Sequence, residues 1–328
     1  MIRHCSVAEA LALLSSPDAP EELSLAHGCA ALVVGPGEWP EDGLTPAQRR
    51  TLDWLPCVTV APSTEPAWRR FDVAAGDAAA DLVLATITAC PQASLALARL
   101  LRVAERSDPL TALYAESVTY GLLQAGPEHA AWHAPAMDDR GVTGRVRVER
   151  TDDRVAVVLD RPDRHNALDL AMRDGLVDAL RAVAADQTIE SVVLRGDGPS
   201  FCSGGDLADF GALPDPMTAH LVRSTRLPAR AVLDVRSRLT AQVHGSTVGA
   251  GVELAAFAGR VVAAPTTTFR LPEVGMGLVP GSGGTWSVTK RVGRQRAAWL
   301  ALTGVEIDAP TALHWGLVDQ VTDEDCRG

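Results

Sequence analysis

The chain has 328 residues, of which 47% are hydrophobic and 22% charged, so it holds enough apolar material for a folded core and is not globally disordered. This length suits one large domain or two domains of ordinary size. The formal net charge of −11 argues against a nucleic-acid partner, because phosphate backbones are bound by clustered lysines and arginines. It does not exclude a ligand with a few phosphates, which local cations or helix N-termini can bind.

Cysteine usage and apolar runs indicate the compartment. None of the cysteines forms a close pair of the kind that metal sites and redox centres use, so we expect reduced thiols and no metal site. The N-terminus lacks an apolar signal core, and no run of about 18 apolar residues is present that could span a bilayer. We therefore expect a cytoplasmic protein with no membrane partner. The six cysteines are Cys5, Cys29, Cys57, Cys90, Cys202 and Cys326.

A stretch rich in Gly, Pro, Asp and His at residues 127–144 interrupts the regular patterns, as linkers and loops do. We place a domain boundary near Arg140. The prediction is an N-terminal α/β region of residues 1–140 followed by a second domain of residues 141–328.

The N-terminal region has mixed strand and helix signals but no evident site. Short apolar runs at residues 30–34 and 57–60 predict buried strands, and residues 82–103 and 110–132 each predict one amphipathic helix. Its tryptophans and histidines have no nucleophile or paired acid at a meaningful spacing, so we expect them to serve in packing.

After the boundary, strand and helix patterns alternate. Residues 154–160 and 191–195 predict strands, and the apolar positions between them recur with helical spacing after Asn166, which we expect to cap that helix. Continued alternation favours right-handed βαβ crossovers and a largely parallel sheet. Ligands of such sheets lie beyond the strand ends, often at helix N-termini.

Three segments of this half have compositions typical of a ligand site. Residues 201–207 (Phe-Cys-Ser-Gly-Gly-Asp-Leu) form a glycine turn after a strand. Residues 244–255 (His-Gly-Ser-Thr-Val-Gly-Ala-Gly-Val-Glu-Leu-Ala) place small residues at a strand-to-helix junction, where a ligand can approach backbone N–H groups. Residues 269–285 place Glu273 beside a proline and ahead of a run of glycines. Each segment alone is compatible with a structural role, but their order and spacing are harder to dismiss.

In this order the segments resemble the enoyl-CoA hydratase (crotonase) superfamily over residues 145–322. Residues 161–168 near the start, and 302–304 and 312–318 near the end, extend the resemblance. It implies a ββα spiral core, an acyl-CoA thioester as substrate and no further cofactor. It also implies a homo-oligomer, a trimer or a hexamer.

The resemblance assigns roles to individual residues. The N–H groups of Gly205 and Ala250 match the oxyanion hole, which stabilises the charge that develops on a thioester enolate. Family members often have glycine where Ala250 stands, but a methyl group leaves the N–H intact. Glu253 and Glu273 match the two acids of the hydratase branch, where two carboxyl groups on one water supply a base and an acid. Contacts with CoA are implied for Arg161, Arg164, His165, Ala167, Ser203 and Gly204.

The reaction itself stays open at this point. Reversible hydration of a 2-enoyl-CoA leads because it explains two acids, with an isomerase as the runner-up. A hydrolase, a cofactor-free dioxygenase and a non-catalytic acyl-CoA-binding partner protein are further alternatives. Surface-helix and loop positions are the structural alternatives for Glu253 and Glu273. Cys202 has no histidine partner at local spacing, so we expect a packed thiol there.

Family members carry covering helices after the segment that matches residues 316–318. Here residues 91–102, 116–120 and 126–128 resemble that tail instead. We expect residues 1–140 to be a relocated or duplicated crotonase-like half, whose helices replace the tail and pack on a crotonase core, its own or a neighbour's. An independent regulatory domain is the alternative.

Overall fold

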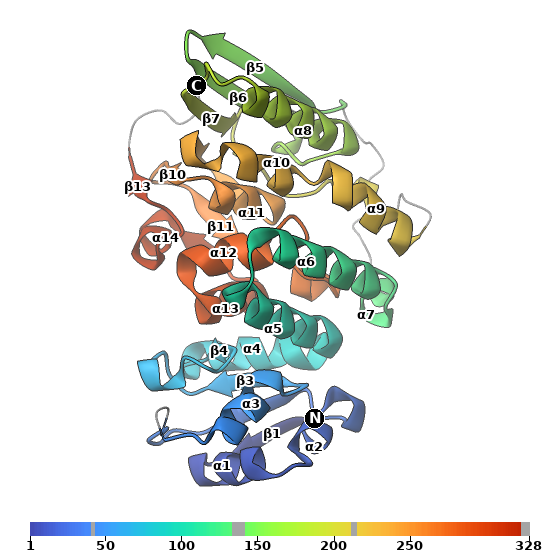
Figure 1. The fold of residues 1–328 in the computed structure, drawn as a ribbon, viewed down its shortest axis with the longest axis vertical. Helices are drawn as coiled ribbons and strands as arrows, with labels where there is room; N and C mark the ends of the chain where they lie inside the picture. The colour runs from blue at the N-terminus through green and yellow to red at the C-terminus, as the bar shows by residue number, and fades with distance from the viewer. Residues whose placement is uncertain (41–42, 133–141, 211–214, 323–328) are drawn as a thin grey trace.

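The computed structural model describes residues 1–40, 43–132, 142–210 and 215–322. In these ranges the chain forms three sheets with helices between and around them, and the N-terminal region lies at one end of the long axis (Figure 1). No single helix of the described chain is long and apolar enough to cross a membrane. The pair Ala79–Ala89 and Pro91–Arg106 passes that test jointly, by length and composition alone, and is bent by 111°.

The N-terminal region is built on a parallel sheet in the order β1-β2-β3-β4. Two of its helices begin at capping boxes, in which a Ser or Thr side chain and a Glu or Gln three residues later bond each other's backbone N–H groups. The strands predicted at residues 30–34 and 57–60 are confirmed. The elements are β1 (Ile2–Cys5), α1 (Val7–Ser15), α2 (Ala19–Glu22), η1 (Leu25–His27), β2 (Ala31–Val34), α3 (Pro46–Trp54), β3 (Val58–Ala61), η2 (Pro66–Trp68) and β4 (Val73–Ala74).

Proline breaks both of the long helices predicted after this sheet. Cys90, before Pro91, takes φ −129° and ψ 64°, because the proline ring disfavours the helical conformation in the preceding residue. The expectation of one continuous helix in each stretch is therefore wrong. The chain instead forms α4 (Asp77–Ala89), α5 (Pro91–Arg106), α6 (Pro109–Gln124) and α7 (Pro127–Ala131).

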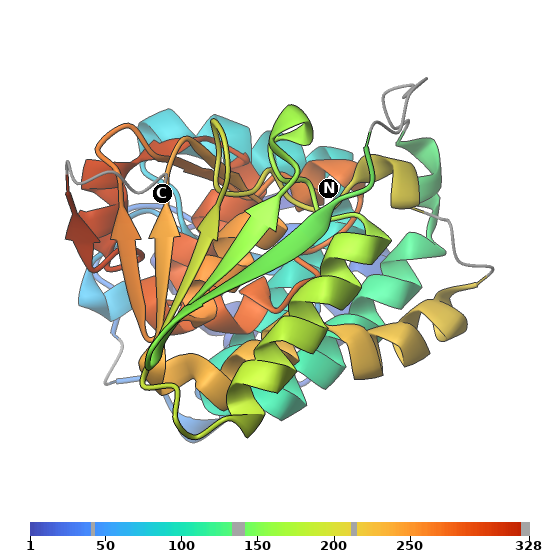
Figure 2. The same cartoon turned by 90° about the horizontal axis from the view of Figure 1, so that it is seen from above.

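The second half contains a sheet in the order β13-β10-β8-β7-β6-β5, parallel except for the β5–β6 hairpin, and a smaller sheet β12-β11-β9. Figure 2 shows the strands of the larger sheet side by side. The largely parallel sheet predicted from the alternating pattern is confirmed. The strands are β5 (Arg145–Thr151), β6 (Arg154–Asp160), β7 (Ser191–Gly196), β8 (Leu239–Val243), β9 (Ser246–Val248), β10 (Arg260–Ala263), β11 (Thr268–Arg270), β12 (Ile307–Asp308) and β13 (Gln320–Val321).

α-Helices and 3-10 turns connect the strands of this half. The α-helices are α8 (Leu170–Ala185), α9 (Pro216–Arg226), α10 (Pro228–Val235), α11 (Ala250–Phe257), α12 (Gly284–Val292), α13 (Arg294–Thr303) and α14 (Ala309–Trp315). The 3-10 turns are η3 (Pro162–Arg164), η4 (Leu207–Asp209), η5 (Arg236–Arg238) and η6 (Glu273–Met276).

Asn166 does not cap the helix that follows it, which corrects our expectation. The cap of α8 is Asp169, whose side chain accepts from the Met172 N–H at 2.8 Å. Asn166 is buried with φ 54°, and its amide donates to the carbonyl oxygens of Asp197 and Ser200 at 2.8 Å. This residue therefore ties two loops together.

Helices α5 and α6 pack on α12 and α13, and their side chains share one buried core with residues of the second half. The predicted packing of these helices on the second half, within the same chain, is confirmed. Leu122 of α6 lies outside this contact and is 72% exposed. The leucines buried in this contact are Leu97, Leu100, Leu101 and Leu123.

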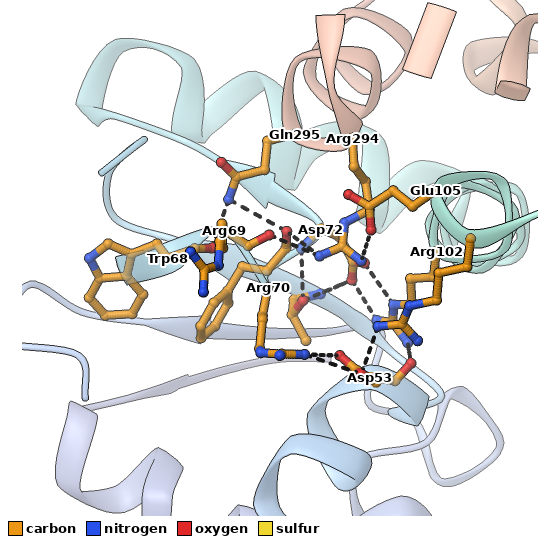
Figure 3. A network of polar contacts seen from close by, with 12 residues as sticks. Asp53, Trp68, Arg69, Arg70, Asp72, Arg102, Glu105, Arg294 and Gln295 are labelled. Carbon is orange, nitrogen blue, oxygen red and sulfur yellow. Dashed lines mark hydrogen bonds and ion pairs between the residues drawn. The ribbon is translucent and has the colours of Figure 1, made fainter. Parts of the chain in front are cut away.

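A buried polar network docks the N-terminal sheet onto α5 and α13 (Figure 3). Arg102 of α5 donates to both carboxylate oxygens of Asp72, at 2.7 and 2.5 Å, which is the two-bond geometry that favours Arg–carboxylate pairs. From α13, Arg294 donates to the Arg69 carbonyl at 3.0 Å, and Gln295 donates to the Trp68 carbonyl at 2.9 Å. Charge and packing thus hold the two halves together.

Candidate active site

A cavity of about 400 Å³ lies among α6, α8, α9, the start of α11 and two loops. Gly205, Ala250, Glu253 and Glu273, which lie in three separate sequence segments, all line it. The structure therefore brings together the four residues predicted to carry the chemistry.

The backbone N–H groups of Gly205 and Ala250 lie on two loops in contact. Leu168 donates to the Gly204 carbonyl at 2.8 Å and fixes the first loop. A methyl group placed on Gly204 would lie 3.8 Å from the Ala250 nitrogen. Ala250 opens α11, so its N–H has no carbonyl one turn earlier to bond. Neither N–H has an acceptor within the described chain, so both are available to a ligand.

Glu253 is buried in the first turn of α11, with 1% of its surface exposed. Its Oε2 accepts from the N–H groups of Ser282 at 2.6 Å and Gly284 at 2.7 Å. Burial raises the pKa of Glu253 to about 7, against the opposing effect of these backbone bonds. The carboxyl group can therefore exchange a proton near neutral pH.

Glu273 is the first residue of η6, and the lack of a side chain at Gly249 leaves space for its carboxyl group. Gly249 has φ 51°, and a methyl group there would lie 2.5 Å from Glu273 Oε1. The Oε2 of Glu273 is buried and has no hydrogen-bond partner in the described chain. Burial, and then repulsion from Glu253, raise the pKa of Glu273 well above its usual value, which favours the protonated form of this carboxyl group.

A third buried carboxyl group, Glu116, comes from α6 in the N-terminal region. It accepts from Gly283 N at 2.6 Å, from Thr285 N at 3.0 Å and from Thr285 Oγ1 at 2.5 Å. Burial raises the pKa of Glu116 to about 8, and repulsion from Glu253 adds to the rise. Sequence reasoning missed this role. The available signal was an acid inside an otherwise apolar helix, a residue type that is almost never buried without partners.

Glu116, Tyr120 and Gln124 recur every four residues and so share one face of α6. Tyr120 and Gln124 line the cavity. The Tyr120 ring packs over Gly281, where a methyl group would lie 2.5 Å from ring carbons. The N-terminal region, in which the sequence showed no evident site, therefore forms part of the cavity wall.

A family model described as enoyl-CoA hydratase/isomerase matches residues 150–326, which is more than half of the chain. The chain belongs to this family.

Relatives and solved structures agree with that membership. The chain is 34% identical over 176 residues to 1,2-epoxyphenylacetyl-CoA isomerase of Escherichia coli, covering 52% of this chain and 67% of that protein. It is 35% identical over 179 residues to 2,3-dehydroadipyl-CoA hydratase of the same species, covering 54% and 69%. It is also similar to a crystal structure of enoyl-CoA hydratase from Thermoplasma volcanium, with TM-score 0.50, 32% identity and coverage of 56% and 73%.

The second half thus has the crotonase fold of the family, and the N-terminal α/β region is an addition to it. The matches span about two thirds of the relatives' own length.

Of the residues expected to contact CoA, Arg161 is committed to internal structure. It is 5% exposed and donates to Asp206 at 2.6 Å and to the carbonyl oxygens of Val142 and Ala167 at 2.9 and 3.1 Å. Removing this guanidinium would leave Asp206 as an unpaired buried charge. The guanidinium for which a CoA contact was expected is therefore bonded within the protein.

The other expected CoA residues form two adjoining segments. Ser203 donates from its N–H to the His165 carbonyl at 2.9 Å and from its hydroxyl to the Arg164 carbonyl at 3.3 Å. His165 is exposed, and its Nδ1 lies 2.9 Å from Ser200 Oγ. The structure places Arg164, His165, Ala167, Ser203 and Gly204 beside one another, next to the Gly205 loop.

Cys202 precedes the Gly205 loop in the sequence, and its thiol is buried. Burial raises the pKa of Cys202 to about 12, and its sulfur lies 3.8 Å from the Gly204 carbonyl oxygen. It is a packed thiol, as expected, and is not activated as a nucleophile. Five cysteines of the described chain are free, and no group of three or more His, Cys, Asp or Glu residues in these ranges is placed to hold a metal ion.

Proposed function

We propose that this family member stabilises an acyl-CoA thioester enolate and catalyses the reversible hydration of a 2-enoyl-CoA. The observation that carries the proposal is the meeting of two buried carboxyl groups, Glu253 and Glu273, with two unbonded N–H groups in one cavity.

The N–H groups of Gly205 and Ala250 would bind the thioester oxygen. Negative charge grows on this oxygen when the enolate forms, so two fixed donors stabilise the transition state more than the ground state. Such a donor commonly contributes about 3–4 kcal/mol to lowering the barrier.

The surroundings of Glu253 and Glu273 suggest which of them acts as the base and which as the acid. Glu253 accepts two backbone bonds, which favour its carboxylate form and suit it to take a proton from water as the water oxygen adds to the β-carbon. The raised pKa of Glu273 favours its protonated form, so Glu273 would give its proton to the α-carbon. Addition therefore leaves Glu253 protonated and Glu273 ionised, and dehydration runs the same transfers backwards.

The direct test is turnover of 2-enoyl-CoA esters by the purified protein. We expect 3-hydroxyacyl-CoA products, seen in mass spectra as the gain of one water, together with loss of the conjugated thioester absorbance. If the protein binds these esters and forms no hydrated product across chain lengths, the hydratase proposal is wrong.

Isomerisation of an acyl-CoA double bond is the second candidate. A single base can catalyse this isomerisation. Of the two acids, Glu273 has a carboxyl oxygen, Oε2, that is buried and has no hydrogen-bond partner in the described chain. One similar relative is named an enoyl-CoA isomerase/hydratase. Incubation of 3-enoyl-CoA esters in D₂O separates the candidates, since an isomerase forms the 2-enoyl ester without adding water.

The homo-oligomer implied by the family also stays a proposal. Light scattering of the purified chain would distinguish a trimer or hexamer from a monomer by mass.

A further inference from the structure

Beyond the carboxyl groups, the cavity wall is formed by helices from both halves of the chain. Ser282 binds Glu253, and the Tyr120 ring covers the neighbouring Gly281. On the same ring lies Arg223 of α9, with its guanidinium carbon 4.9 Å from the ring centre. This series of contacts places Tyr120 between the catalytic acids and Arg223.

Arg223 is half-buried, and its bonds within the described chain go to neutral groups. Its Nε donates to Ser117 Oγ at 2.9 Å and its Nη2 to the Ser117 carbonyl at 3.1 Å. Ser117 Oγ also lies 2.9 Å from His220 Nδ1, which fixes the hydroxyl and hence the guanidinium. Nη1 has no acceptor among the described residues. A partly buried cation with no counter-ion is costly, so an anion supplied by a ligand would stabilise it.

The aspartates that line the cavity are committed elsewhere. Asp215 caps α9, eight residues and so about 12 Å along the helix from Arg223. Asp169 caps α8, Asp206 pairs with Arg161, and Asp209 accepts from the Leu170 N–H at 3.0 Å. Glu116, one turn before Tyr120, is bonded to Gly283 and Thr285.

Two neutral donors line the same cavity as Arg223. The Tyr120 hydroxyl has no hydrogen-bond partner in the described chain, and Gln124 lies one turn further along the same face of α6. The Oε1 of Gln124 is buried without a donor. A hydroxyl, an amide Nε2–H and a guanidinium in one cavity are groups from which a carboxylate accepts hydrogen bonds.

We infer that Arg223 binds an anionic group at the far end of the acyl chain, so that the substrate class is a 2-enoyl-CoA with a terminal carboxylate. The inference rests on the proposed function, because the acyl chain reaches this wall only with its thioester oxygen at Gly205 and Ala250. A chain ending in methyl leaves the guanidinium unpaired, whereas a carboxylate forms charge-assisted bonds to it.

The test compares esters of equal chain length that end in a carboxylate or in a methyl group. Wild-type kcat/KM should favour the carboxylate ester by about 10- to 100-fold, the effect of one or two charge-assisted hydrogen bonds. Arg223→Gln should abolish this preference, and Arg223→Lys should retain part of it. Arg173→Gln is the matched control and should keep the wild-type preference. Arg173 also lines the cavity, but its Nε and Nη2 bond Asp174 at 2.9 and 2.8 Å.

Equal kcat/KM for the two esters, or a preference for the methyl ester, would overturn the inference. If neither ester reacts, calorimetric titration with the two saturated acyl-CoA analogues gives a separate answer. Tighter binding of the carboxylate analogue then supports the Arg223 site while the hydratase proposal fails, and equal binding rejects the site as well. The wild-type comparisons decide the matter even if Arg223→Gln does not fold.

Discussion

Glu116 and Glu253 accept hydrogen bonds from four consecutive backbone N–H groups, two each. Glu253 accepts from Ser282 and Gly284, and Glu116 accepts from Gly283 and Thr285. Two acids from different halves of the chain therefore hold this one segment between them, an arrangement that we call the clamp. The segment leads into α12, whose positive end lies at the same point.

The clamp predicts how stability depends on pH. Burial raises the pKa of Glu116 to about 8 in the folded protein, above its value in an unfolded chain. The folded state therefore binds the proton more tightly, and this contribution to stability, complete at acidic pH, is lost as pH rises through about 8. The free energy of unfolding, measured by chemical denaturation, should therefore be lower above this pH than below it.

Glu116→Gln should make this decline shallower, because the amide resembles the protonated acid and does not ionise. Glu253 and Glu273, whose pKa values are also raised, should keep part of the decline. The matched control is Glu65→Gln, an exposed acid in the same half of the chain, which should leave the wild-type slope unchanged. An identical slope in Glu116→Gln and wild type would show that another group causes the pH dependence.

Catalysis should require both acids facing the cavity. Glu253→Gln and Glu273→Gln should each reduce hydratase turnover by about 10²- to 10⁴-fold, the usual contribution of proton transfer, while CoA-ester affinity changes little. Steady-state kinetics and calorimetric binding measure the two effects. Glu306→Gln, an exposed acid of the same half, is the control. Wild-type turnover in either cavity variant would remove that residue from the mechanism.

The kcat/KM of hydration should rise with pH through about 7 on its acidic side. Glu253 must be ionised to act as the base, and burial places its pKa at about 7. The carboxylate is the active form, so protonation at lower pH removes activity. A pH–rate profile that is flat across this range would contradict the assignment of Glu253 as the base.

Gly249→Ala should damage the site through the space that it fills. A methyl group at this position would lie 2.5 Å from Glu273 Oε1, so the carboxyl group must move. Gly293→Ala tests backbone strain alone, because Gly293 also has a positive φ, 81°, and its side-chain position has no heavy atom within 4 Å. Both variants should lose stability, measured as Tm, but only Gly249→Ala should lose kcat beyond that loss. Equal losses of kcat would reject the contact.

Local patterns and motifs predicted much of this site but not its contribution from the N-terminal half. The glycine-rich segments placed Gly205, Ala250, Glu253 and Glu273 correctly on one cavity, since each motif is contiguous in sequence. Glu116 could not be found in that way, because its bond to Gly283 joins residues 167 positions apart. The helix breaks were readable, because Pro91 and Pro127 are present in the sequence.

Deleting residues 1–140 should leave an insoluble or disassembled remainder without activity. The deletion removes α5 and α6 from α12 and α13, together with four buried leucines that each contribute roughly 1.5–3 kcal/mol. It also removes Glu116 from the 282–285 segment and Tyr120 from the cavity wall, so two N–H groups beside Glu253 lose their acceptor. Apolar surface exposed in this way normally recruits another chain, which favours aggregation. Light scattering, circular dichroism and turnover of the fragment from Val142 onward check this expectation against the full chain. A stable, correctly assembled and fully active fragment would show that the N-terminal half is an appendage and that neither the helix packing nor the clamp matters for function.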